Sequence, residues 1–148
     1  TTKDASSVDV VVHGFRDAHL PGDWLGVKKA MGELRDVDPD LVFTHRADDL
    51  HQDHRLLGEL AGQTFRDHLV LSYEIPKFDG DLGRPTLYAP CSEADLEAKM
   101  RACDAFNSQR GKQWFDDETF RGLARIRGIE CNSPSRYAEA FYCRKWMV

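Results

Sequence analysis

Short apolar runs alternate along this chain with segments in which apolar residues recur at helical spacing. Residues 8–13 are a nearly continuous β-branched run that predicts a buried strand. Apolar residues recur every three or four positions over residues 24–34, which predicts a helix that ends before Asp38-Pro39. Residues 41–44 form a second apolar run. A strand, a crossover helix and a strand in this order predict two parallel strands.

The alternation continues through the second half of the chain. Residues 53–67 predict a helix and residues 69–75 a strand, followed by a Gly-, Asp- and Pro-rich surface loop at residues 77–84. Ser92 followed by Asp95 has the spacing of a capping box and marks the start of another helix.

Two more elements complete the predicted fold. Residues 116–127 predict a helix with Gly128 as its stop signal, and residues 137–144 predict a last strand. We therefore expect one domain over residues 1–148, an α/β, Rossmann-like three-layer sandwich with a mostly parallel sheet. Ligands bind such sheets beyond the carboxyl ends of the strands, so the loop after residue 44 is the expected site.

Composition excludes several classes of function. The formal charge of −5 arises from 25 acidic and 20 basic side chains without a basic block, so we expect no nucleic-acid partner. No apolar run reaches the length of a membrane span, and the polar first residues predict no signal peptide. The four cysteines form no CxxC pair, which favours free thiols and a cytoplasmic location.

The densest group of functional side chains lies between the predicted strand at residues 41–44 and the following helix. Three imidazoles and three carboxylates fall within residues 44–55. A helix that starts near Asp53 places His51 just before its first turn and His54 just inside it, so both rings can face one pocket. Histidine nitrogen is a common zinc ligand, and this pattern predicts a metal or catalytic site.

The helix start also limits what this group can do. A helix N-terminus carries partial positive charge, which favours a developing oxyanion over a cation, so one imidazole is expected to serve the substrate. A catalytic zinc needs three protein ligands, hence more ligands must come from elsewhere. The alternative is a solvated loop in which Asp53 caps the helix, His54 is a first-turn residue and Arg55 is a surface charge.

These residues resemble the second signature of the PIG-L/LmbE-like zinc-dependent N-acetylglucosaminyl deacetylases. That signature is a His-Pro-Asp-His-like segment after a strand that ends in Thr-His. It stands here as His51-Gln52-Asp53-His54-Arg55 after residues 40–45, with Gln52 in place of proline. The resemblance extends, in the expected order, to the segments Gly14-Phe15-Arg16-Asp17, Ser108-Gln109 and Tyr137-Ala-Glu-Ala-Phe141.

The resemblance implies a role for each matching residue. His54 would be a Zn²⁺ ligand, His51 would polarise the acetyl oxygen, and Asp53 would orient a neighbouring histidine. Asp17 would bind sugar hydroxyls, and the substrate pocket would include the remaining two candidates, Arg16 and His45. The implied reaction is zinc-dependent hydrolysis of the N-acetyl group of an N-acetylglucosamine-type sugar conjugate.

The family's other signature, a His-Pro-Asp-Asp-Glu-like segment, supplies further metal ligands and the general base. Nothing before Val8 resembles it. We therefore expect the C-terminal part of such an enzyme, truncated at the N-terminus, whose site is completed by an N-terminal segment or a partner chain. A self-contained site that uses His45, Asp48 and Asp49 is an alternative, although both aspartates are expected in a mobile, solvated loop. A non-catalytic sugar-binding domain, a vestigial domain and a metal-free structural subunit are further alternatives.

Truncation and aromatic residues give the last expectations. A sheet that lacks a central strand exposes an apolar edge, so the chain is expected to aggregate or to form a homo-oligomer. Trp24 has helical spacing and is expected in the core, whereas Trp114 is the better candidate for stacking on a sugar ring.

Overall fold

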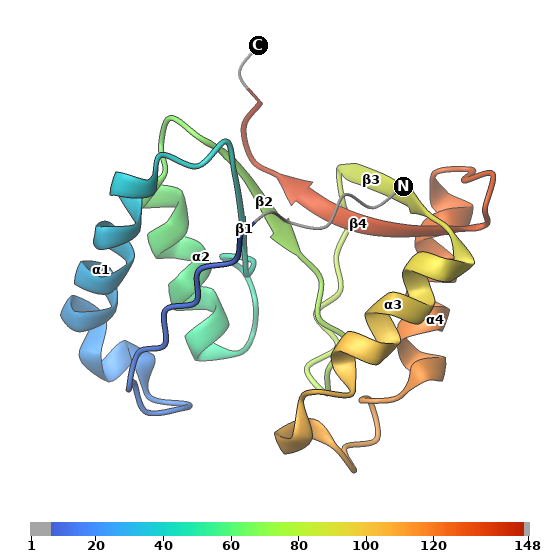
Figure 1. Cartoon of the computed structure of the whole chain (residues 1–148), viewed down its shortest axis with the longest axis horizontal. Helices are drawn as coiled ribbons and strands as arrows, with labels where there is room; N and C mark the ends of the chain where they lie inside the picture. Colours follow the sequence, from blue (N-terminus) through green and yellow to red (C-terminus); the bar gives the residue numbers. More distant parts are fainter. Residues whose placement is uncertain (1–6, 147–148) are drawn as a thin grey trace.

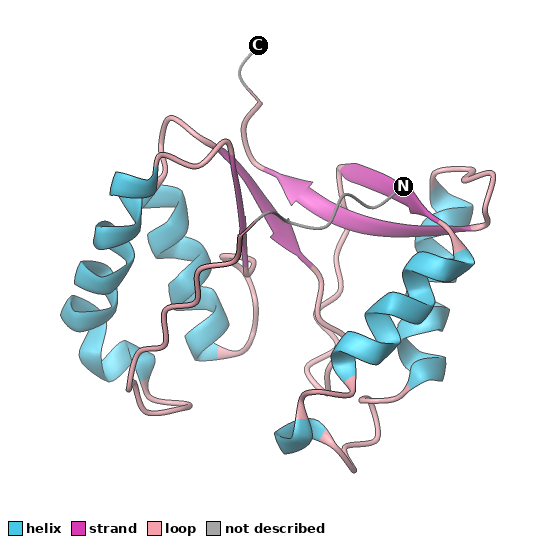
Figure 2. Cartoon of the chain, viewed as in Figure 1, coloured by secondary structure: helices cyan, strands magenta, loops and turns pink. Residues whose placement is uncertain are grey.

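The computed structural model describes residues 7–146, which form an open four-stranded sheet with helices at both of its ends (Figures 1 and 2). The strand order is β1-β2-β4-β3. The strands are β1 (Leu41–Thr44), β2 (Leu69–Tyr73), β3 (Leu87–Cys91) and β4 (Tyr137–Cys143). The α-helices are α1 (Trp24–Glu33), α2 (Gln52–Thr64), α3 (Glu93–Cys103) and α4 (Asp117–Glu130), and the short 3-10 helices are Leu20–Asp23, Leu34–Val37 and Asn107–Gln109.

The α/β class and the open sheet are confirmed, but the pairing of the strands is mixed. β1 and β2 are parallel, as the strand-helix-strand pattern predicted, whereas β4 runs antiparallel to both β2 and β3. In the described sheet the expectation of mostly parallel strands therefore holds only at the β1–β2 pair. The sequence analysis missed β3, a five-residue edge strand with Pro90, a residue that sheets tolerate at their edges.

The helix that crosses from the N-terminal segment to β1 packs against α2, and Figure 1 shows this pair beside β1 and β2. Val27 of α1 and Leu56 and Leu60 of α2 form a buried cluster. This confirms the inner face of α2, whereas in α1 Leu25 and Leu34 are exposed. Asp23 caps α1 by accepting the Gly26 N–H at 3.2 Å. Burial of this shared face holds the start of α2 next to the end of β1.

Helices α3 and α4 form a second pair beside β3 and β4 (Figure 1). The capping box of Ser92 and Asp95 is present at the start of α3, as predicted. The prediction that Gly128 stops α4 is wrong, because the helix continues to Glu130. A Cβ at position 128 would lie 2.1 Å from the Arg136 carbonyl oxygen, so this glycine permits the close approach of the chain that enters β4.

Two further predictions for the N-terminal part are wrong. Residues 8–13 form no strand, and Val8, Val10, Val11 and Val12 are 65–86% exposed. β-branched residues favour extended backbone, but a strand also needs a partner for its N–H and C=O groups, and none lies beside this segment in the described structure. Trp24 is 42% exposed and lies outside the core.

The outer strand of the sheet has an exposed apolar surface. β1 lies at one edge, and its Phe43 side chain is 54% exposed while touching Phe141 of β4 at a ring distance of 5.4 Å. All four cysteines are free thiols, as expected. Among the helices at residues 7–146, none combines the length and apolarity that a membrane span requires.

Candidate active site at the end of strand β1

Three histidines predicted to be functional come together where β1 ends and α2 begins. His45 follows β1 directly, His51 is the N-cap of α2, and His54 lies in its first turn. The rings of His45 and His54 are stacked with centroids 4.1 Å apart and an interplanar angle of 5°. The centroids of His51 and His54 are 4.4 Å apart. The strand end and the helix start therefore place all three imidazoles in one cluster, of which the spacing predicted the pair His51 and His54.

The hydrogen bond of His54 determines which of its nitrogens is available to a ligand. Its Nδ1 lies 3.2 Å from Oδ2 of Asp49, whose other oxygen is 3.2 Å from the Lys77 ammonium. An ionised carboxylate can only accept, so Nδ1 carries the proton and donates it. The Nε2 lone pair of a neutral His54 is then free, which is the arrangement found in metal-ligating histidines.

His51 has the opposite arrangement. Its Nδ1 accepts the backbone N–H of Asp53 at 3.3 Å, in the position of a helix N-cap. An amide N–H can only donate, so the proton of a neutral His51 lies on Nε2. This N–H and the N-terminus of α2 together favour an oxygen atom that gains negative charge.

Asp49 is the residue around which the cluster is organised, and the expectation of a solvated loop is wrong for it. Asp49 is 5% exposed and also accepts the His51 N–H at 2.8 Å. Asp48 agrees with that expectation, since its side chain is 74% exposed and pairs with Arg46 at the surface. Of these two neighbouring aspartates, Asp49 points inward and positions the histidines, whereas Asp48 points into solvent.

Lys77 attaches the loop after β2 to this cluster. Its side chain is only 8% exposed and contacts Asp49 at 3.2 Å and Asp81 at 2.5 Å. The second oxygen of Asp81 accepts the Leu50 N–H at 2.8 Å. These contacts tie the predicted surface loop to the histidine loop at two points, and the two loops form one unit.

Asp53 connects α2 to the N-terminal segment. Its Oδ1 accepts the Leu20 N–H at 3.1 Å, and the neighbouring Gln52 donates to the Ala18 carbonyl oxygen at 3.1 Å. Asp53 is 5% exposed. The contact of its carboxylate is therefore with the segment before α1, whereas Asp49 is the carboxylate that orients a histidine.

His45 is held as a neutral imidazole. Burial, followed by the proximity of His54, lowers its pKa to about 4. Its Nε2 is 3.3 Å from the Tyr73 hydroxyl, and burial raises the pKa of that hydroxyl. The Nδ1 atom of His45 is buried without a partner among the described residues. The predicted role of His45 in a substrate pocket remains a prediction.

Arg16 and Asp17 are both exposed. Arg16 lines a hollow of about 660 Å³ with Gln52 and Arg55, next to the start of α2. Asp17 is not among the residues that line this hollow, and its backbone carbonyl oxygen is 2.9 Å from Nδ1 of His19. The fold therefore brings Arg16 to the same hollow as Gln52 and Arg55 of α2, and sugar binding by Arg16 or Asp17 remains a prediction.

The described residues offer only part of a metal site. Between residues 7 and 146, no three His, Cys, Asp or Glu side chains are grouped so that they could hold a metal ion. This excludes, within that range, the self-contained site of His45, Asp48 and Asp49, because Asp49 is engaged by Lys77 and Asp48 by Arg46. Nε2 of His54 is a ring nitrogen of the kind that zinc binds.

The sequence analysis missed the positioning role of Asp49 and the presence of Lys77 and Tyr73 in the site. The positioning role of Asp49 had a local signal, because it lies five residues before His54 and within reach of a ring in the first turn of α2. Lys77 and Tyr73 had none, since their contacts depend on how the end of β2 lies beside the end of β1.

Comparisons with known proteins agree on the fold. No family model matches the sequence, and a search of curated proteins finds no match. Solved structures with a similar fold include N,N'-diacetylchitobiose deacetylase from Pyrococcus horikoshii, in complex with an inhibitor, with a TM-score of 0.64 and 23% identity over 87% of this chain. The conserved protein TT1542 from Thermus thermophilus has a TM-score of 0.67 and 22% identity over 91% of this chain.

A third similar structure is the 4-carboxy-2-hydroxymuconate hydratase GalB from Pseudomonas putida, with a TM-score of 0.59 and 18% identity over 86% of this chain. The chain covers 54%, 65% and 60% of the lengths of the three structures, in the order given. These likenesses establish an open α/β fold that this chain shares with a sugar deacetylase and with a hydratase. Function must be argued from the site, because one fold carries several chemistries.

Proposed function

We propose that this chain belongs to the PIG-L/LmbE-like deacetylases and takes part in zinc-dependent removal of the N-acetyl group from an N-acetylglucosamine-type sugar. The observation that carries the proposal is that Nδ1 of His54 faces a carboxylate while Nδ1 of the adjacent His51 faces a backbone N–H. The hydrogen bond to Asp49 leaves His54 with a free Nε2 lone pair, while the Asp53 N–H leaves His51 with a proton on Nε2. A metal ligand needs the first arrangement, and a donor to an acetyl oxygen needs the second.

The proposed roles follow from this arrangement. His54 would hold zinc through Nε2, with its ring fixed by Asp49. Zinc supplies Lewis-acid polarisation of the amide carbonyl when it is bound. His51 would donate its Nε2–H to the carbonyl oxygen as negative charge develops there, assisted by the N-terminus of α2. His45 would form a neutral wall against the His54 ring.

The substrate would approach past the N-terminal segment. The proposed contacts to sugar hydroxyls are those of Arg16, which lines the hollow beside α2, and of Asp17. Asp53 holds this segment through the Leu20 N–H, so its proposed effect on catalysis runs through substrate placement as well as through the helix start.

Further ligands and a general base are required, and we propose that another segment or a partner chain supplies them. The free edge of β1, with Phe43 exposed beside it, is the proposed place of attachment. A second copy of the chain could cover the same edge. Sedimentation of the isolated chain tests this part: a single well-behaved monomer with cooperative melting would argue against an edge that needs cover.

The alternative is a sugar-binding domain without catalysis, and one observation favours it. The metal-binding set within residues 7–146 is incomplete, whereas a polar cluster beside a hollow would suffice for binding. Amine release distinguishes the two functions, because a binding domain retains sugar affinity without forming an amine.

The test uses this chain together with the segment or partner chain that completes the site, and it measures zinc affinity by competition with a chromophoric chelator and amine release from N-acetylglucosamine with zinc added. His54→Ala should abolish zinc binding, whereas His51→Ala should retain zinc and lose amine release. His68→Ala is the matched control, since His68 contacts Asp38 away from the cluster. Equal zinc affinity in the His54 variant and the wild type would refute the ligand assignment.

A further inference from the structure

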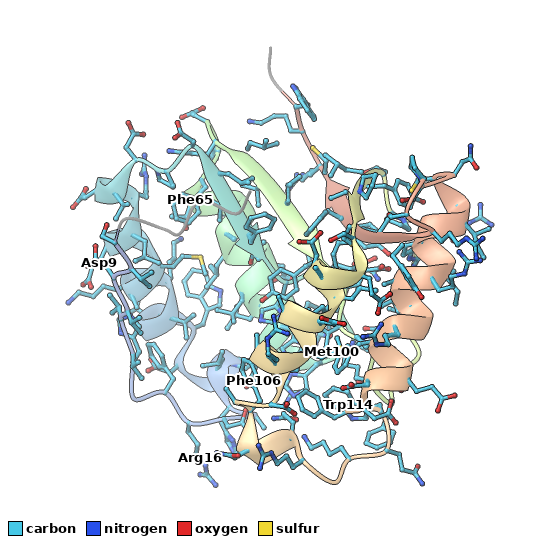
Figure 3. The ribbon with its side chains drawn as sticks, turned by 45° about the vertical axis from the view of Figure 1, so that its right-hand side comes forward. Asp9, Arg16, Phe65, Met100, Phe106 and Trp114 are labelled. Atoms are coloured by element: carbon cyan, nitrogen blue, oxygen red, sulfur yellow. The ribbon has the colours of Figure 1, made fainter. Side chains whose placement is uncertain are left out.

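The loop between β2 and β3 contacts both halves of the fold. In Figure 3, Phe65 at the end of α2 marks one half, and Met100 of α3 marks the other. Residues 77–84, which we call the bridging loop, begin beside the histidine loop, residues 45–51. They end against β4 and α4. The bridging loop is therefore the place where one half of the chain can influence the site that the other half forms.

Charged groups fix the start of the bridging loop to the histidine loop. The Lys77 side chain is 8% exposed and lies 3.2 Å from Asp49 and 2.5 Å from Asp81. The second oxygen of Asp81 accepts the Leu50 N–H at 2.8 Å. Asp49 is the carboxylate that faces the His54 ring. The position of the bridging loop thus determines where this carboxylate finds its cation.

Tyr142 of β4 holds the end of the bridging loop. Its hydroxyl oxygen accepts the Gly83 N–H at 3.0 Å, and the hydroxyl donates to Glu74 at 2.9 Å. The Arg46 guanidinium lies over its ring at 4.3 Å and donates to the Asp81 carbonyl oxygen at 2.6 Å. A Cβ at position 83 would lie only 3.0 Å from this hydroxyl oxygen. Tyr142 therefore contacts the bridging loop through its hydroxyl and the histidine loop through its ring.

The buried ion pair beneath Tyr142 does not depend on this hydroxyl. Glu74 is paired with Arg127 through two bonds, at 2.5 and 2.8 Å, and both side chains are less than 9% exposed. Glu74 thus keeps a charged partner without the tyrosine, whereas the hydroxyl is the acceptor for the Gly83 N–H. Burial, followed by the bond to Glu74, raises the pKa of Tyr142 to about 12, so the hydroxyl keeps the proton that it donates.

We propose that Tyr142 is a positioning residue for the histidine cluster and acts through the bridging loop. The hydroxyl fixes the loop at Gly83. The fixed loop keeps Lys77 against Asp49, the carboxylate that orients the histidines. The half of the chain with β4 and α4 thereby controls the geometry of a site to which it gives no histidine. The consequence for zinc binding rests on the proposed function, whereas the positioning itself does not.

The test variant is Tyr142→Phe, which removes the hydroxyl and keeps the ring that Arg46 covers. Tyr88→Phe is the matched control, because the Tyr88 hydroxyl also donates to a carboxylate, that of Glu130 at 3.1 Å. Glu130 and Pro85, the partners of this hydroxyl, both lie outside the bridging loop. The two variants therefore lose the same group, and only one of them loses a contact with the loop.

Native-state hydrogen exchange of the metal-free chain, followed by NMR, measures the effect on the loops. The Leu50 N–H reports on the far end of the bridging loop, because its acceptor is Asp81. The N–H of the fully buried Leu60 in α2 reports on global unfolding. In Tyr142→Phe, exchange at Leu50 relative to Leu60 should become roughly five- to tenfold faster, because a hydrogen bond that holds the loop is lost. In Tyr88→Phe, this ratio should not change.

The ring ¹⁵N shifts of His54, measured under the same conditions, show whether the effect reaches the histidines. In the wild type the proton should lie on Nδ1, which faces Asp49. In Tyr142→Phe the share of the form protonated at Nε2 should rise by roughly two- to fivefold, because the Lys77 ammonium holds Asp49 less firmly. Tyr88→Phe should give the wild-type shifts.

Zinc affinity is then measured on this chain together with the segment or partner chain that completes the site. Tyr142→Phe should bind zinc roughly three- to tenfold more weakly, because groups that orient a ligand histidine tune its affinity. Tyr88→Phe should bind zinc as the wild type does.

Unchanged relative exchange at Leu50 in Tyr142→Phe would overturn the positioning role and leave the proposed function intact. Faster exchange with unaltered His54 shifts would also overturn it, because the hydroxyl would then hold the loop without acting on the histidines. If both change but the completed wild type binds no zinc, the positioning role stands and the proposed function fails.

Discussion

Replacement of Asp49 by asparagine tests the central argument, because this one carboxylate connects three parts of the site. It accepts the His51 N–H at 2.8 Å and the His54 ring N–H at 3.2 Å, and it lies 3.2 Å from the Lys77 ammonium. The asparagine side chain would occupy nearly the same volume but would carry no charge. Its single carbonyl oxygen can replace only part of these contacts.

The size of the effect follows from these contacts. A hydrogen bond to a charged group contributes about 1.5–3 kcal/mol, and Asp49 accepts two from the histidine loop. Lys77 keeps its contact with Asp81, which prevents the full penalty of an unpaired buried charge. We therefore expect Asp49→Asn to lower the free energy of unfolding by about 2–4 kcal/mol.

Two measurements check this expectation. Urea denaturation of metal-free protein gives the free energy of unfolding, and ¹⁵N NMR of the imidazoles reports which nitrogen carries the proton. In the wild type, His54 should be protonated at Nδ1 and His51 at Nε2, and Asp49→Asn should disturb His54 alone. Asp48→Asn is the control and should lower stability less than Asp49→Asn, because the Asp48 side chain is 74% exposed and Arg46 keeps its bond to the Asp81 carbonyl oxygen at 2.6 Å.

The reasoning would be refuted if wild-type His54 carried its proton on Nε2, since the free lone pair would then be absent. It would also fail if Asp49→Asn were as stable as Asp48→Asn. Either result would mean that the buried carboxylate does not organise the histidines.

Three further predictions concern stability. The pKa of His45 is lowered from 6.5 to about 4, so the unfolded chain takes up the proton at a higher pH than the folded chain does. The free energy of unfolding of metal-free protein should therefore fall by up to about 3 kcal/mol between pH 6.5 and pH 4. Urea denaturation at a series of pH values should show this slope, and its persistence in His45→Phe would assign it to another group. Gly128→Ala should lower the free energy of unfolding by at least about 2 kcal/mol, because the added Cβ would meet a backbone carbonyl oxygen at 2.1 Å. Gly122→Ala, with open space around it, should raise the free energy of unfolding by up to about 1 kcal/mol. Equal melting temperatures of the two variants would contradict the close approach at Gly128. Glu74→Gln should lower the free energy of unfolding, measured by thermal denaturation, by about 2–4 kcal/mol, because Glu74 and Arg127 form a buried ion pair at 2.5 Å. A decrease below about 1 kcal/mol would show that the other partners of Arg127 are enough to compensate its buried charge.

Features that depend on neighbouring residues in the chain were predictable. The apolar spacing of α1 and α2, the capping box of α3 and the parallel pair β1–β2 are recorded within short segments of sequence. The proximity of His51 and His54 was predictable for the same reason, because both lie at the start of one helix, whereas the stacking of His45 on His54 became visible only in the structure.

Features that depend on distant partners were not predictable. Residues 8–13 have the composition of a strand, but no strand lies beside them in the described fold. β3 exists because β4 offers it hydrogen-bond partners, although its own sequence contains a proline. Gly128 reads as a helix stop in the sequence, but the structure shows that a glycine is needed there because the turn before β4 packs against α4 at this position.

The sequence by itself determined where the chemistry lies and which residue types are present, because the histidines and aspartates are close together along the chain. Only the tertiary structure decided what each of them does. Burial of Asp49 against Lys77, a residue 28 positions away, directs the proton of His54. Pairing of two buried charges depends on where separate strands end in space, and no local pattern of residues records that distance.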